Sequence, residues 1–72
     1  MTAVDYMIDS LAAELVLLVM EDLHVDFVTA LDTVYNSDTF SKVANPRTEL
    51  YYQSPLYIYS YLEHEIHNGV MN

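Results

Sequence analysis

The sequence predicts an all-α fold, a compact bundle of three to four helices with a long apolar N-terminal helix and a short third helix. Apolar residues recur at three- and four-residue spacing over most of the chain, which corresponds to one face of a helix. Ser, Thr and Asp precede these periodic segments, where they favour helix starts. With 72 residues, the chain is expected to form one helical domain, residues 1–72.

The first helix is expected over Ala3–Leu23, with Thr2 and Asp5 placing oxygen atoms near the free N–H groups of its first turn. One face carries apolar residues at helical spacing, namely Val4, Met7, Ile8, Leu11, Leu15, Leu18 and Val19.

Val16, Leu17 and Met20 fall off that face, so the middle of the first helix is apolar nearly all round. A helix of this kind is buried on more than one side. Few elements of so short a chain are available to cover it. We therefore expect a second copy of the chain, in a homodimer, or a partner protein to cover Leu17 and Met20.

Two shorter helices are expected next. Asp26 is a candidate N-cap for a helix over Phe27–Tyr35, and Ser37 or Asp38 for a short helix in SDTFSKVA. The inward face of the first of these would comprise Phe27, Ala30, Leu31, Val34 and Tyr35, and that of the second Phe40 and Val43. Asn45 precedes Pro46, which disfavours helix there, and residues 47–53 are expected to form a connector.

The last helix is expected to start at Ser54-Pro55, because serine caps free N–H groups and proline is well tolerated at the first helical position. The segment LYIYSYL alternates as a strand would, but a single strand would have no obvious neighbour. Gly69 stands where a C-cap glycine belongs. The core face would comprise Pro55, Ile58, Tyr59, Leu62 and Ile66.

Four tyrosines near the C-terminus are candidate interaction residues. Tyr57 and Tyr61 lie off the core face of the last helix, and Tyr51 and Tyr52 lie in the connector. Tyrosine buries a large area while keeping a polar tip, which favours it at interfaces. The alternative is that the connector tyrosines fold back and cover the core.

The charge balance narrows the class of partner. Eleven acidic residues face only Lys42 and Arg47, which gives a net charge of −9. Such a surface repels nucleic acids and anionic membranes, so we expect neither as a partner. A basic protein partner is compatible with this charge, and the field of the chain would steer its approach.

Three features predict a cytoplasmic protein. The chain has no cysteine, which fits a reducing compartment. Its start, MTAVDYMIDS, is acidic, unlike a secretory signal. The most apolar run, LAAELVLLVM, contains a glutamate and is about half as long as a membrane span.

No motif predicts catalysis or a cofactor. The serines have no glycine near them to form a nucleophile elbow, and one glycine is too few for a phosphate-binding loop. The acidic pairs Asp5 with Asp9 and Glu21 with Asp22 are typical of solvated helix faces. We therefore expect no enzymatic activity.

The weak candidates for metal ligands are His64 and His67, which stand three residues apart beside Glu63 and Glu65. A third ligand would have to be His24 or a distant carboxylate. The alternative is a solvated last helical turn, where histidine is compatible with the negative end of the helix dipole.

The segments YNSDTF and TELYYQSPLYIYSYLEHEI resemble a family of short, acidic, all-helical bacterial proteins of unknown function. The resemblance covers roughly residues 15–66, and Glu49 stands where a glycine is expected. It implies no activity, cofactor or catalytic residue. Members look like companions encoded beside other small proteins, some resembling toxin–antitoxin pairs, which implies a binding role. The matching residues are Ala30, Leu31, Tyr35, Asn36, Ser37, Thr48, Leu50, Tyr51, Gln53, Ser54, Pro55 and Tyr57.

Together these features predict a non-enzymatic interaction protein that self-associates and neutralises or regulates a basic partner. Two alternatives remain open. One is a metal- or small-ligand-binding module centred on His64 and His67. The other is a transcription regulator resembling a helix-turn-helix protein, which the scarcity of Lys and Arg disfavours.

Overall fold

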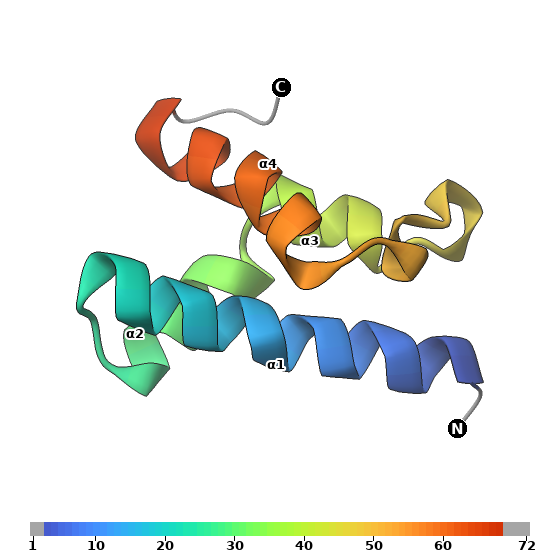
Figure 1. Ribbon diagram of the computed structural model, residues 1–72, viewed down its shortest axis with the longest axis horizontal. Coiled ribbons are helices and arrows are strands. Elements are labelled where there is room, and N and C mark those ends of the chain that lie inside the picture. Colours follow the sequence, from blue (N-terminus) through green and yellow to red (C-terminus); the bar gives the residue numbers. More distant parts are fainter. Residues whose placement is uncertain (1–2, 69–72) are drawn as a thin grey trace.

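The computed structural model describes residues 3–68 and confirms the all-α fold with its long first helix and short third helix (Figure 1). The helices are α1 (Ala3–Leu23), α2 (Phe27–Tyr35), α3 (Asp38–Val43) and α4 (Pro55–Asn68). The expected connector holds two short 3₁₀ turns, η1 (Pro46–Thr48) and η2 (Leu50–Tyr52). The expected caps Thr2 and Gly69 lie outside the described residues.

α1 runs along the long axis of the molecule, and the other elements pack around it (Figure 1). α2 folds back against α1, while α3 and α4 lie together on the other side. Between them lies a core whose largest fully buried side chains come from all four helices: Leu15, Val19, Val34, Thr39, Val43, Ile58 and Leu62.

The prediction that α1 is buried on more than one side is confirmed. Val16, which the periodicity left off the main face, is only 3% exposed, and Met20 is half-buried against the core. The chain itself supplies this cover, because α1 contacts α2 on one side and α4 with η2 on the other. Of the three residues that the periodicity left off the main face, Leu17 is the exception, because 57% of this residue is exposed.

The predicted inward face of α2 is wrong at both ends. Ala30 and Val34 are fully buried and Leu31 is half-buried, but Phe27 and Tyr35 are 54% and 51% exposed. A nine-residue helix lying on α1 buries one narrow stripe, and here that stripe is Ala30 and Val34. Phe27, Leu31 and Tyr35, four residues apart, form a second stripe beside it.

Side-chain caps fix the helix starts as predicted. Asp26, Ser37 and Ser54 each accept a hydrogen bond from the backbone N–H three residues further along. Of the two candidates for the start of α3, the cap is therefore Ser37 rather than Asp38. Pro55 occupies the first position of α4.

The carboxylate of Glu65 ties α4 to the start of α3. It accepts hydrogen bonds from the backbone N–H groups of Asp38 (2.8 Å) and Thr39 (2.9 Å) and from the Thr39 hydroxyl (2.7 Å). Partial burial raises the pKa of Glu65, but these hydrogen bonds together with the charge of Lys42 outweigh it and hold the pKa below its usual value.

Two of the non-glycine residues that the structure describes adopt left-handed backbone conformations, His24 (φ 54°) after α1 and Glu49 (φ 56°) between the two 3₁₀ turns. This region is unfavourable for any residue with a Cβ atom and is normally occupied by glycine. Glu49 is the residue at which the family resemblance leads one to expect glycine.

We expect Glu49→Gly to raise the free energy of unfolding by about 0.5 kcal/mol, because the relief of left-handed strain exceeds the added freedom of the unfolded chain. Urea denaturation measures the change. The control is Glu14→Gly on the exposed side of α1, which should lower the free energy of unfolding by about 1 kcal/mol. A loss at Glu49 matching that at Glu14 would contradict the prediction.

Glu65→Gln should lower the free energy of unfolding by about 1 kcal/mol at pH 7, since charge-assisted hydrogen bonds are weakened. The stability that comes from the lowered pKa is present above the unfolded-state value near 4.5 and is lost as the pH falls through the lower folded-state value. The difference between wild type and variant should therefore shrink in urea titrations from pH 7 to pH 3. Glu63→Gln in metal-free buffer is the control, and a difference that stays constant with pH would refute this role for Glu65.

Candidate functional site

The four candidate tyrosines form two separate local pairs. The rings of Tyr51 and Tyr52 lie 4.6 Å apart between centroids, and those of Tyr57 and Tyr61 meet edge to face at 5.3 Å. Tyr51 is half-buried against the core, so at this residue the connector does fold back. Tyr52 and Tyr57 are 66% and 45% exposed.

The polar tips of the second pair are already engaged. The hydroxyls of Tyr57 and Tyr61 lie 3.0 Å apart and share a hydrogen bond, which raises the pKa of Tyr57. The first pair lines one wall of a groove of about 300 Å³ beside the N-terminal half of α1. Tyr6 and Glu14 of α1 also line this groove. The tyrosines therefore serve two different surfaces.

A second groove, of about 280 Å³, lies between α1 and α2 and is more consistently apolar. We call it the α1–α2 groove. One wall is formed by the second stripe of α2, which consists of Phe27, Leu31 and Tyr35. The other wall is the side of α1 that contains Leu17. Its lining residues are Asp9, Ala13, Val16, Leu17, Phe27, Leu31 and Tyr35.

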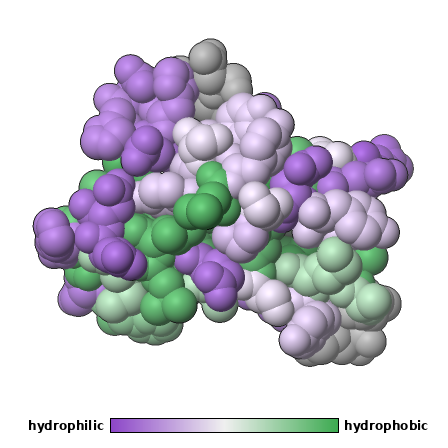
Figure 2. Space-filling model, viewed as in Figure 1, coloured by the Kyte–Doolittle hydropathy of each residue, from purple (hydrophilic) through white to green (hydrophobic). Residues whose placement is uncertain are grey.

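The α1–α2 groove gathers three of the large apolar side chains that the chain leaves at its surface, Leu17, Phe27 and Tyr35, each more than half exposed. Figure 2 shows hydrophobic residues at the surface in the region of α1 and α2, bordered by strongly hydrophilic ones. The rings of Tyr35 and Phe40 pack edge to face, with centroids 4.8 Å apart, which fixes one end of the groove.

Sequence reasoning found Leu17 but assigned Phe27 and Tyr35 to the core. The sequence does contain a signal that α2 has more apolar residues than the core can take. Six of its nine positions are apolar: Phe27, Val28, Ala30, Leu31, Val34 and Tyr35. A helix of two and a half turns packed on one neighbour cannot bury them all.

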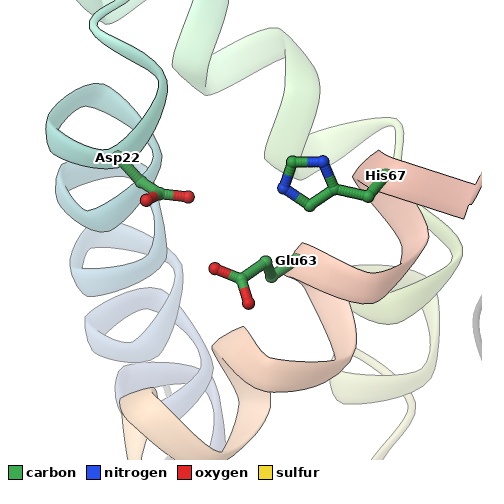
Figure 3. A group of neighbouring side chains, drawn as sticks. All are labelled: Asp22, Glu63 and His67. Atoms are coloured by element: carbon green, nitrogen blue, oxygen red, sulfur yellow. The ribbon is translucent and has the colours of Figure 1, made fainter.

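The predicted histidine pair is divided by the structure. His67 lies with Glu63 and with Asp22 at the far end of α1, and their ligand atoms are all within 4.8 Å of one another (Figure 3). His64 is half-buried, with its Nδ1 3.2 Å from the Asn68 amide nitrogen. The sequence offered His24 or a distant carboxylate as a further ligand. In the structure the distant carboxylate, that of Asp22, lies beside His67.

The arrangement of α3 is unfavourable for DNA recognition. It has only six residues, and the carboxylate of Glu65 closes its N-terminal end. Recognition helices direct their N-terminal residues at the bases, where a carboxylate is repelled by the neighbouring phosphates. Among the described residues, no helix is both long and apolar enough to cross a bilayer.

Comparisons with protein-family models, with curated proteins and with solved structures find no match to this chain. The resemblance to short acidic bacterial proteins therefore stays a prediction.

Proposed function

We propose that this chain is a non-enzymatic interaction protein that binds a basic, amphipathic helix of a partner protein in the α1–α2 groove. The observation that carries the proposal is the groove itself, which holds Leu17, Phe27 and Tyr35 half-exposed on a chain with a net charge of −9. Binding of this kind would neutralise or regulate the partner.

Burial of the apolar side chains in the groove favours binding, but it is too small by itself to account for micromolar affinity. Fully burying a large apolar side chain is worth about 1.5–3 kcal/mol, so covering the exposed half of three of them contributes about 3 kcal/mol in total. Micromolar binding requires about 8 kcal/mol after the entropic cost of association. A wider contact and favourable electrostatics must therefore contribute the rest.

Electrostatics favour a cationic partner. Asp9 lies in the groove lining, and two further carboxylates, those of the N-cap Asp26 and of Asp32 within α2, are exposed. Hydrogen bonds to the Thr29 side chain and backbone hold the pKa of Asp26 below its usual value, so this carboxylate stays ionised. Lys or Arg flanking the apolar anchors of a bound helix would meet these charges, which speeds association and excludes acidic competitors.

The shape of the groove favours a helix as the bound element. The α2 wall presents Phe27, Leu31 and Tyr35 at four-residue spacing, and the α1 wall presents Ala13 and Leu17 at the same spacing. Apolar side chains at positions i, i+3 or i+4, and i+7 of a third helix match this repeat.

A second copy of the chain is the other candidate occupant, as the predicted homodimer requires. It would bring two chains of charge −9 together. At physiological salt the repulsion is screened only beyond about 8 Å, so charges at the rim of the groove would still oppose each other. Charge thus favours the basic partner.

The proposal is tested by fluorescence anisotropy with a synthetic helical peptide that carries leucine at positions 1, 5 and 8 and lysine on its remaining faces. Leu17→Ser and Phe27→Ser should each weaken binding about fivefold, because each removes about 1 kcal/mol of apolar burial from one wall of the groove. Tyr52→Ser, at a residue with 66% exposure outside the groove, should leave the affinity unchanged. A peptide of the same composition without the apolar stripe should bind at least tenfold more weakly. Equal losses in all three variants would refute the groove as the binding site.

Light scattering after size exclusion, over a hundredfold range of concentration, decides between the two occupants. A basic partner predicts that the isolated chain is monomeric. A dimer that Leu17→Ser dissociates and Tyr52→Ser does not would assign the groove to a second copy instead.

A further inference from the structure

Three side chains of metal-ligating type converge where the C-terminal end of α1 meets α4 (Figure 3). Asp22 comes from α1, and Glu63 and His67 come from successive turns of α4. None of them lines the α1–α2 groove. The cluster therefore calls for its own explanation.

The spacing of the donor atoms suits a single ion. All three lie within 4.8 Å of one another, and tetrahedral bonds of 2.0–2.2 Å to zinc would set them about 3.4 Å apart. The three side chains are exposed, so their torsions are free to close this difference without moving the backbone.

Tyr59 gives the cluster an outer support. Its hydroxyl donates a 2.8 Å hydrogen bond to Asp22 Oδ2, and Tyr59 lies one turn before Glu63 on the same side of α4. Hydrogen bonds that orient ligating carboxylates are a regular feature of protein metal sites.

The charges also match a divalent ion. Two carboxylates and a neutral imidazole carry −2 together, and the repulsion between Asp22 and Glu63 is relieved when a cation lies between them. The two basic residues of the chain lie elsewhere: Lys42 on α3 interacts with Glu65, and Arg47 is in η1.

We propose that Asp22, Glu63 and His67 form a binding site for one divalent transition-metal ion, with zinc as the ion that best suits the donors. The imidazole favours zinc over magnesium and calcium, which prefer oxygen ligands alone. Three protein ligands leave a coordination position open to water or to another side chain. Asp22 also lines an adjacent hollow of about 450 Å³ with Glu21 and His24, which gives space for that ligand.

Isothermal titration of the whole chain with zinc chloride tests the site. We expect saturation at one ion per chain and a loss of affinity of at least tenfold in both His67→Ala and Asp22→Asn. His64→Ala is the matched control, since it removes an imidazole from the same helix outside the cluster, and its affinity should stay within twofold of wild type. The proposal is overturned by a lack of saturable binding, by equal losses at His64 and His67, or by magnesium binding as tightly as zinc.

Thermal unfolding separates failure to bind from failure to fold. An ion at a hundred times its dissociation constant raises the ratio of folded to unfolded chains about a hundredfold. Zinc should therefore raise the Tm of wild type and of His64→Ala. In His67→Ala the metal-free Tm should be unchanged and the shift lost. A zinc-dependent dimer in light scattering would overturn a site built within one chain.

Discussion

The fold depends on covering α1, which is apolar on nearly every side between Leu11 and Met20. A chain of this length has only short elements for the task. α2 covers one side through Ala30 and Val34, and α4 covers another through Ile58 and Leu62. α2 folds back immediately after α1, across a link of three residues in which His24 takes a left-handed conformation. The strain is compatible with the fold because the burial that this tight link makes possible is worth several times more.

The same constraint produces the α1–α2 groove. α2 carries more apolar side chains than a short helix can press against one neighbour, so Ala30 and Val34 enter the core and the stripe from Phe27 to Tyr35 remains outside. Leu17 remains outside on α1 for a related reason, since α2 covers the residues beside it. The exposed apolar surface is thus concentrated between two helices whose other faces are fixed by the core. Because the groove is already formed, a partner that bound there would cause little loss of conformational entropy in this chain.

Carboxylates have distinct structural roles in this acidic chain. Glu65 closes the N-terminus of α3 through three hydrogen bonds. Asp22 accepts a hydrogen bond from the hydroxyl of Tyr59, the only polar group of that buried side chain. Both contacts reach from α4 to another helix, on different sides of it. Glu63 takes part in neither of these contacts, and it is the carboxylate that stands with Asp22 and His67. The candidate metal site therefore uses a residue that the fold leaves available.

The sequence by itself determined the helical class, the helix bounds within the described residues and most of the caps, because these depend on spacing and on hydrogen bonds between residues three or four positions apart. It also identified Leu17 as surplus apolar surface and His67 as a candidate ligand. Only the tertiary structure decided that Phe27 and Tyr35 face outward, that Glu65 caps α3 and that Asp22 meets His67. Periodicity fixes relative angles within one helix, whereas contacts between residues such as Asp38 and Glu65, 27 positions apart, depend on how the helices pack.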